Sequence, residues 1–220
     1  MTHTTYVFDA YGTLFDVHAA VRRHIEAVGP DATAFSDLWR AKQLEYSWTR
    51  ALMGRYRDFW RLTEEALDYC FGKFPSADQS LKPMLLDAYM HLDAYPEVHR
   101  VLKQLKDQGM RLAILSNGSP KMLEAAVQSA GLETILDDIF SVDALKTFKS
   151  KPEVYDMVTT AYRIFPEAVS FQSSNRWDIA GAQAFGFRCV WINRMGQPEE
   201  YKDLKPAAVL KDLDGLIGLA

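Results

Sequence analysis

Thr4-Thr5-Tyr6-Val7-Phe8-Asp9-Ala10-Tyr11-Gly12-Thr13-Leu14-Phe15 is the stretch around which the chain is organised. Its run Tyr6-Val7-Phe8 is β-branched and aromatic without polar alternation, which predicts a short strand buried on both faces of a parallel sheet. Asp9 follows directly, and a carboxylate at the C-terminal end of such a strand lies where open α/β sheets bind ligands. Gly12 permits a tight turn, and Thr13 offers a hydroxyl close to Asp9. The segment therefore predicts a functional aspartate, with an aspartate that only caps the next turn as the alternative.

The composition allows one large α/β domain or a core domain with an insertion. The chain has 220 residues, 48% of them hydrophobic, and a formal net charge of −4. This charge gives no electrostatic reason to expect nucleic acid or an anionic membrane as a partner. No window approaches the roughly 18 apolar residues of a membrane span, and the N-terminus lacks a signal-peptide pattern. Cys70 and Cys189 are far apart, so we expect reduced, buried thiols in a cytoplasmic protein.

Residues from about 17 to 93 show helical patterns and no convincing strand. The first predicted helix has Ser36 as its expected N-cap and Gly54 as its stop, and further helices are expected over 56–71 and 85–92. We therefore predict a helical insertion at 16–94, with the core formed by 1–15 and 95–220. Apolar residues of the first helix recur at three- and four-residue steps and mark one face: Leu38, Ala41, Leu44, Trp48 and Leu52.

From Tyr95-Pro96 onward the chain alternates between helix and strand, which predicts a parallel sheet with right-handed crossovers. The predicted helices cover residues 98–108, 122–130, 153–163 and 179–185. The predicted strands cover residues 110–115, 139–142, 168–171, 188–192 and 207–210.

Four predicted strand ends deliver polar side chains to one edge of this sheet. Any one of them alone is better explained as a turn or cap residue, but four in series make that explanation improbable. The side chains are Asp9 and Thr13, then Ser116 and Asn117, then Lys149 or Lys151, then Ser173, Asn175 and Asp178.

Asp9-Ala10-Tyr11-Gly12-Thr13 resembles the first motif of the haloacid dehalogenase superfamily, whose leading aspartate is a covalent nucleophile. Most members are magnesium-dependent phosphatases in which a second aspartate protonates the leaving alkoxide. Tyr11 holds that position here, and a phenol with a pKa of roughly 10 is a poor acid near neutral pH. A leaving halide needs no proton, so this departure favours carbon–halogen chemistry.

Ser173-Ser174-Asn175-Arg176-Trp177-Asp178 discriminates further within the superfamily. Phosphatase members place aspartates at this strand end as magnesium ligands, whereas Ser173 and Ser174 occupy those places here. A hard cation prefers several carboxylate oxygens, so we expect no metal and no cofactor. The segment closely resembles the motif of the type II L-2-haloacid dehalogenases, as do three segments of the insertion: Leu38-Trp39-Arg40, Gln43-Leu44-Glu45-Tyr46 and Leu52-Met53-Gly54-Arg55-Tyr56.

By this resemblance the chain is identified as a member of the L-2-haloacid dehalogenases. The resemblance implies a Rossmann-like α/β parallel-sheet core of the haloacid dehalogenase type with an inserted helical cap. It also implies a homodimer joined through cap and core helices.

Two lysines compete for one position in the motif. In the dehalogenases that the chain resembles, the lysine and a tyrosine stand six residues apart, which selects Lys149 and Tyr155. Lys151-Pro152 instead matches a pair common elsewhere in the superfamily. We favour Lys149, and with either residue an ammonium close to Asp9 would keep that carboxylate ionised and pair with substrate charge.

The resemblance implies hydrolysis of short L-2-haloalkanoic acids to D-2-hydroxy acids, with halide as the second product. Asp9 would displace the halide from C2 with inversion, and water oriented by Asp178 and Asn175 would hydrolyse the resulting ester. The implied catalytic residues are Asp9, Thr13, Arg40, Ser116, Lys149, Tyr155, Ser173, Asn175 and Asp178. The implied substrate- and halide-binding residues are Ala10, Tyr11, Arg40, Leu44, Phe59, Ser116, Asn117 and Trp177. Two alternatives stay open, a magnesium-dependent phosphatase of the same superfamily and a catalytically silent binding protein.

Overall fold

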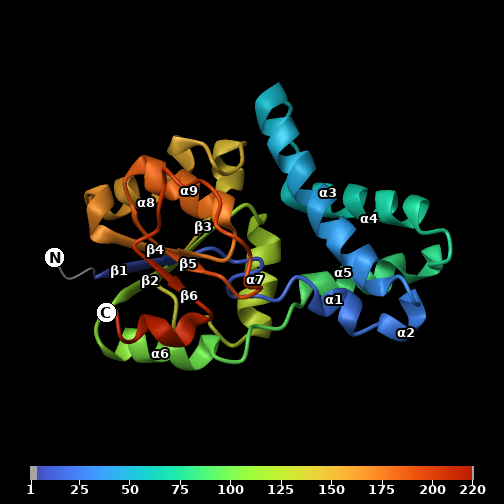
Figure 1. Ribbon diagram of the computed structural model, residues 1–220, viewed down its shortest axis with the longest axis horizontal. Helices are drawn as coiled ribbons and strands as arrows, with labels where there is room; N and C mark the ends of the chain where they lie inside the picture. The colour runs from blue at the N-terminus through green and yellow to red at the C-terminus, as the bar shows by residue number, and fades with distance from the viewer. Residues whose placement is uncertain (1–3, 220) are drawn as a thin grey trace.

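The computed structural model describes residues 4–219, which form a parallel six-stranded sheet with helices around it and a group of helices beyond one end (Figure 1). The strand order is β3-β2-β1-β4-β5-β6, and every neighbouring pair is parallel. The predicted α/β fold class is therefore confirmed. The strands are β1 (Thr5–Phe8), β2 (Arg111–Ser116), β3 (Asp138–Ser141), β4 (Val169–Ser173), β5 (Arg188–Ile192) and β6 (Ala208–Leu210).

Strand β1 lies in the middle of the sheet and is buried along its whole length. The chain turns to β2 on one side of β1 and later returns to β4 on the other. The strand order reverses at this point, and in open α/β sheets ligands bind beyond the C-terminal ends of the strands at such a reversal. Asp9 follows β1 at that point.

Helices α8 and α9 cover one face of the sheet and α6 lies on the other (Figure 1). Helices α7 and α8 begin at Pro120 and Pro152, because proline is pre-organised for the first helical position. Starts were predicted two residues too late for α7 and three too late for α9. The four helices are α6 (Val98–Asp107), α7 (Pro120–Ser129), α8 (Pro152–Tyr162) and α9 (Arg176–Phe185), with short 3₁₀ turns η2 (Val142–Leu145), η3 (Pro166–Ala168) and η4 (Leu213–Leu216).

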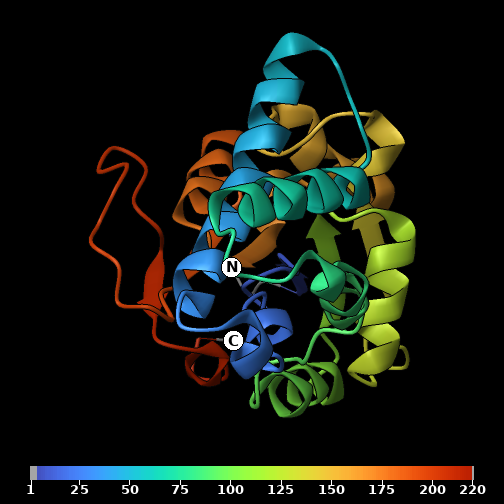
Figure 2. The same ribbon diagram turned by 90° about the vertical axis from the view of Figure 1, so that its right-hand side faces the viewer.

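Five further helices gather beyond the C-terminal ends of the strands (Figure 1), and the longest two cross in front of the sheet in the view of Figure 2. All of them lie within 16–94, the range predicted for a cap domain, and the exact domain boundaries stay a prediction. They are α1 (Ala19–Arg22), α2 (Ile25–Val28), α3 (Ala32–Met53), α4 (Phe59–Lys73) and α5 (Lys82–Met90), with the 3₁₀ turn η1 (Gln79–Leu81).

Helix α3 differs from its prediction in its start and in its buried face. Ser36 is not the N-cap: the helix begins at Ala32, and Ser36 is a buried position whose hydroxyl is 2.8 Å from His18 Nδ1. The apolar positions chosen from the sequence are not the buried face either, since Leu52 is 86% exposed. The helix instead buries a mixed stripe whose polar members find hydrogen-bond partners inside the cap: Phe35, Ser36, Trp39, Gln43 and Ser47.

Helix α4 begins at Phe59, with the Asp58 side chain accepting from Arg61 N, so Tyr56 precedes the helix and does not start it. The Tyr56 hydroxyl donates to Asp143 Oδ1 of η2 at 2.5 Å, and the Tyr56 ring stacks on Phe148 at 5.2 Å. These contacts join the cap to the core at a point remote from the two linkers in the sequence.

Two segments connect the cap to the core, one around Asp16 and the other around Asp93, and these two linkers run side by side. Asp16 N donates to Asp93 O at 2.9 Å, and Tyr95 N donates to Leu14 O at 3.0 Å. Arg194, after β5, donates to Thr13 O at 2.8 Å and forms an ion pair with Glu97 at 2.6 Å. Its guanidinium also lies 3.8 Å from the centroid of the Tyr95 ring. One arginine of the core therefore contacts both linkers.

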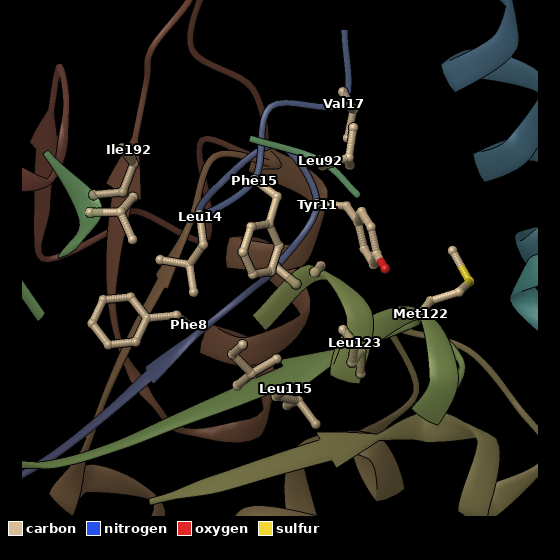
Figure 3. Packing of buried hydrophobic residues seen from close by; sticks show 14 of the residues in the cluster. Phe8, Tyr11, Leu14, Phe15, Val17, Leu92, Leu115, Met122, Leu123 and Ile192 are labelled. Carbon is tan, nitrogen blue, oxygen red and sulfur yellow. The ribbon is translucent and has the colours of Figure 1, made fainter. Parts of the chain in front are cut away.

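Buried hydrophobic side chains form one cluster that continues from the sheet into the linkers (Figure 3). Phe8 and Leu115 lie within the sheet, while Tyr11 packs toward Leu92 and Met122 (Figure 3). The cap is thus packed directly against the loop that follows β1.

Cys70 and Cys189 are buried free thiols. Within residues 4–219, none of the helices combines the length and hydrophobicity that crossing a bilayer requires.

Replacing Arg194 with Met is expected to lower the free energy of unfolding by about 3 kcal/mol, because Glu97 would be left buried without its partner. The two side chains are only 11% and 12% exposed. The matched control is Arg100→Met, whose ion pair with Asp214 is 60% and 52% exposed and should contribute less than about 1 kcal/mol. Urea titration of both variants measures the difference, and equal losses would contradict a structural role for the Arg194 contact.

Candidate active site

Asp9 is 5% exposed and accepts hydrogen bonds on both carboxylate oxygens. Thr13 Oγ1 donates to Oδ2 at 2.9 Å, and Asn175 Nδ2 donates to the same oxygen at 2.8 Å. Lys149 Nζ donates to Oδ1 at 3.0 Å. Gly12 has φ of 91°, a conformation that favours glycine, and this turn brings the Thr13 hydroxyl back to Asp9.

Lys149 lies between two carboxylates and is 2% exposed. Its ammonium is 3.0 Å from Asp9 and 2.7 Å from Asp178. The Lys149 backbone N–H donates to Asn117 Oδ1 at 2.9 Å, so the loop after β2 holds the loop that carries Lys149 in position. Lys151 extends toward solvent, 3.9 Å from Glu153. Of the two lysines considered from the sequence, the structure places Lys149 beside Asp9.

Asp178 is fully buried near the N-terminus of α9 and accepts from Tyr155 OH at 2.9 Å as well as from Lys149. Burial raises the pKa of Asp178 to about 6, with a further contribution from the Asp9 charge, and Lys149 opposes this shift. Burial alone would lower the pKa of Lys149, but the two carboxylates raise it above its usual value. The lysine is therefore a stable cation, and Asp178 changes protonation closer to neutrality than an ordinary aspartate.

The loop after β4 is tied to the loop after β1. Ser174 N donates to Thr13 Oγ1 at 2.8 Å, and Asn175 Nδ2 is also 3.4 Å from Tyr11 O. Ser173 Oγ accepts from Asn175 N at 3.1 Å, which holds the asparagine at the start of α9. Asn175 therefore connects Ser173 to Asp9.

Ser116 and Asn117 lie at the end of β2, where a strand-to-helix turn was predicted. Ser116 Oγ accepts from Gly118 N at 3.1 Å. A Cβ on Gly118 would lie 2.7 Å from Cε2 of the Tyr11 ring, so a side chain at this position would displace Tyr11. The turn therefore packs directly against the loop that carries Asp9.

Arg40 reaches from the cap helix α3 to the same loop. Its Nη2 donates to Tyr11 O at 3.1 Å, the carbonyl that Asn175 also approaches. The Phe59 ring is 6.2 Å from the Tyr11 ring, so a second predicted pocket residue lies here. Ala10 is buried, and its carbonyl accepts from Leu14 N at 2.9 Å.

Leu44 and Trp177 are the predicted pocket residues with the least direct connection to Asp9. Both are partly buried, and the Trp177 ring makes an edge contact with Trp48 at 5.2 Å. This contact joins α9 of the core to the partly exposed face of α3.

Tyr11 takes the place of the second aspartate in the resembling phosphatases. Burial raises the pKa of Tyr11 well above 10, with Tyr89 and Asp9 adding to this effect, so its hydroxyl stays a neutral phenol. A group of this kind is a poor proton donor to a leaving alkoxide near neutral pH.

The donor set does not fit a magnesium ion. Among residues 4–219 no group of three or more His, Cys, Asp and Glu side chains could hold a metal ion. The charge beside Asp9 and Asp178 is supplied by the Lys149 ammonium, which is a hydrogen-bond donor and cannot act as a ligand to a cation.

Three residues close to the site were missed as site residues from the sequence. Tyr89 of α5 stacks on Tyr11 at 5.8 Å, Phe148 packs against Phe59 at 6.0 Å, and Gln43 accepts from Arg40 at 2.7 Å. Gln43 could have been noticed as an amide three residues after Arg40 on one helix. Tyr89 carries no local signal, because only folding brings α5 to Tyr11.

The chain is similar to known proteins in both sequence and fold. The sequence profile described as haloacid dehalogenase-like hydrolase matches residues 3–186. The chain is 49% identical over 197 residues to (S)-2-haloacid dehalogenase 4A of Burkholderia cepacia, which covers 89% of this chain and 85% of that protein. A solved dehalogenase structure superposes with a TM-score of 0.97 at 44% identity, covering 100% of this chain and 97% of the other. The L-2-haloacid dehalogenase of Xanthobacter autotrophicus, solved with chloropropionic acid covalently bound, superposes with a TM-score of 0.88 at 37% identity over 99% of this chain and 98% of its own.

Gly181→Ala is expected to lower the free energy of unfolding by roughly 1–3 kcal/mol, because overpacking strains a filled site. The added Cβ would lie 2.5 Å from both the Tyr155 hydroxyl and Ser150 Cβ. The control is Gly72→Ala within α4, where a Cβ meets nothing within 4 Å and alanine should stabilise the helix by roughly 0.5–1 kcal/mol. The midpoints of thermal and urea unfolding should fall for Gly181→Ala and rise for Gly72→Ala. A stabilising Gly181→Ala would show that Tyr155 is not closely packed there.

Proposed function

Because the chain belongs to the haloacid dehalogenase-like hydrolases, we propose that it hydrolyses short L-2-haloalkanoic acids to D-2-hydroxy acids and halide. The observation that carries this proposal is the pair of buried carboxylates sharing one ammonium, with a neutral tyrosine where a phosphatase needs an acid. Such a site can attack carbon and release an anion that needs no proton. The relatives named (S)-2-haloacid dehalogenase and the neighbour with covalently bound chloropropionic acid support the same reaction.

In the first step an oxygen of Asp9 attacks C2 of the substrate opposite the carbon–halogen bond. The carbon–oxygen bond forms as the carbon–halogen bond breaks, the halide leaves with the bonding electrons, and C2 is inverted. Lys149, Thr13 and Asn175 hold Asp9 in one orientation, so little reorganisation is needed before attack.

Substrate and halide are held by the residues around Tyr11. Arg40 supplies a cation for the departing halide, with help from Asn117. Ser116 with neighbouring turn amides and Lys149 bind the substrate carboxylate. The walls of this pocket exclude water until the ester has formed, and they consist of Ala10, Tyr11, Leu44, Phe59 and Trp177.

In the second step water attacks the carboxyl carbon of Asp9, and the bond from that carbon to the ester oxygen breaks. The departing alkoxide takes up the proton that Asp178 has removed from water, and C2 keeps its inverted configuration because none of its bonds is broken. Asp178 takes the water proton, a role that suits a carboxylate whose pKa is raised by burial. Thr13 and Asn175 already donate to Asp9 Oδ2, so they can stabilise the negative charge that develops on that oxygen. Tyr155 orients Asp178, and Ser173 holds Asn175.

We also propose that the enzyme is a cytoplasmic homodimer, as its resemblance to the dehalogenases implies. Light scattering on the purified protein distinguishes a dimer from a monomer.

The protein should release chloride from L-2-chloropropionate and not from the D-enantiomer, with no effect of chelator. Asp9→Asn should lower this activity by roughly three orders of magnitude or more, since the nucleophile is lost. Hydrolysis of phosphate esters that disappears with chelator would instead support the phosphatase alternative. Binding of halide or carboxylate without halide release would support the silent alternative.

A single turnover in heavy-oxygen water tests the ester. The label should enter the Asp9 carboxyl group and be missing from the first 2-hydroxy acid, because water attacks the ester carbonyl carbon. Mass spectrometry of the product and of the peptide containing Asp9 measures both. Label appearing directly in the first product would exclude the ester.

The rate of ester hydrolysis should fall at acidic pH, because Asp178 must be ionised to accept a proton. Esterified Asp9 is uncharged and no longer raises the pKa of Asp178, so this limb should lie below the pKa of about 6 that Asp178 has beside ionised Asp9. The hydrogen bond from Tyr155 lowers the pKa of Asp178, so Tyr155→Phe should move this acid limb to higher pH. Tyr162→Phe removes a similar hydrogen bond to Asp138 on the surface and should leave the limb in place. Single-turnover rates across pH measure the shift, and a Tyr155→Phe profile that matches the wild type would argue against Asp178 as the base.

A further inference from the structure

We propose that Gln43 is the positioning residue of the halide site: its neutral side-chain amide holds the Arg40 guanidinium next to the nucleophile loop without cancelling its charge. This inference rests on the proposed function, in which Arg40 meets the halide. It assigns a role to a buried cap residue that contacts Arg40, which in turn contacts the nucleophile loop at Tyr11 O.

Gln43 is 1% exposed and is hydrogen-bonded on every side. Its Oε1 accepts from Arg40 Nη1 at 2.7 Å, and its Nε2 donates to Thr63 Oγ1 at 2.6 Å. The Tyr89 hydroxyl lies 3.0 Å from Nε2 and 3.1 Å from Oε1. Three cap helices, α3, α4 and α5, therefore meet at this one amide.

The orientation of the Gln43 amide follows from its surroundings. Thr63 Oγ1 donates its only proton to Phe59 O at 2.8 Å, so the same oxygen must accept from Gln43. The NH₂ group of Gln43 therefore faces Thr63, and Oε1 is left to accept from Arg40. The backbone of α4 thus determines which end of the amide Arg40 meets.

The charge on Arg40 is left available by this arrangement. Both hydrogen bonds of the guanidinium in the described part of the chain go to uncharged oxygens, Gln43 Oε1 and Tyr11 O. A carboxylate at position 43 would make a charge-assisted bond and neutralise the cation that an anion must meet. A neutral amide fixes the geometry and preserves the charge.

Gln43 also connects the cap to the nucleophile loop by packing. Tyr89, its hydrogen-bonding neighbour, stacks on the Tyr11 ring at 5.8 Å with planes 14° apart. Arg40 contacts the carbonyl of that same Tyr11. One side chain of the cap therefore sets the position of both the cation and the aromatic wall beside Asp9.

The test compares Gln43→Glu, which adds charge at nearly constant shape, with Gln43→Met, which removes the hydrogen bonds. The rate of ester formation in a single turnover should fall roughly 10- to 100-fold in Gln43→Met, the range for losing a hydrogen bond to a charged group. It should fall at least as far in Gln43→Glu, because the new carboxylate neutralises Arg40. Bromide inhibition should weaken in the order wild type, Gln43→Met, Gln43→Glu, because only the last neutralises Arg40. Hydrolysis of the preformed ester should be unchanged, since the groups that carry it out lie in the core.

The matched control is Gln79→Glu, the same substitution at an exposed cap position, which should behave as wild type. Wild-type ester formation and bromide inhibition in either Gln43 variant, or stronger inhibition in Gln43→Glu than in Gln43→Met, would overturn the proposal. A merely structural role would slow both steps together and lower the melting temperature. If Gln43→Glu does not fold, the step-resolved rates of Gln43→Met decide alone. Absence of halide release by the wild type would instead refute the proposed function.

Discussion

The ammonium of Lys149, enclosed between Asp9 and Asp178, is the contact on which the site depends. Two carboxylates buried this closely would repel one another and tend to take up protons if no cation lay between them. The lysine lets both carboxylates lie side by side although only 5% of Asp9 and none of Asp178 is exposed. The ammonium donates to Asp9 Oδ1 and to Asp178 Oδ2. The other oxygen of each carboxylate is therefore left to accept from other side chains.

Parallel strands bring these groups together. Four separate loops carry Asp9, Asn117, Lys149 and Asn175. Three of these loops directly follow a strand, and the loop of Lys149 follows the turn η2 after β3, so all four start from the same edge of the sheet. The loops then fix one another through side-chain to backbone hydrogen bonds. The sheet and its loops therefore place the nucleophile and the lysine, while the cap adds Arg40, which donates to Tyr11 O.

The core was largely predictable because its signals are local. A buried run ending in Asp9, prolines at helix starts and polar residues after strands all lie within short windows, and β5 was predicted with its observed bounds. The cap was harder. Helix α3 buries Ser36, Gln43 and Ser47 in place of the leucines that periodicity selects, since their partners come from other segments and from the helix backbone itself. Tyr89 and the contacts of Gln43 with α4 and α5 are recognisable only after these helices have packed, because no sequence window contains that information.

Two of the contacts that fasten the cap to the core involve residues far apart in the sequence. The paired linkers lie under Arg194 at one, and Tyr56 reaches Asp143 at the other. Moving the cap away from the core would therefore require the Tyr56–Asp143 hydrogen bond to break as well as the linkers to bend.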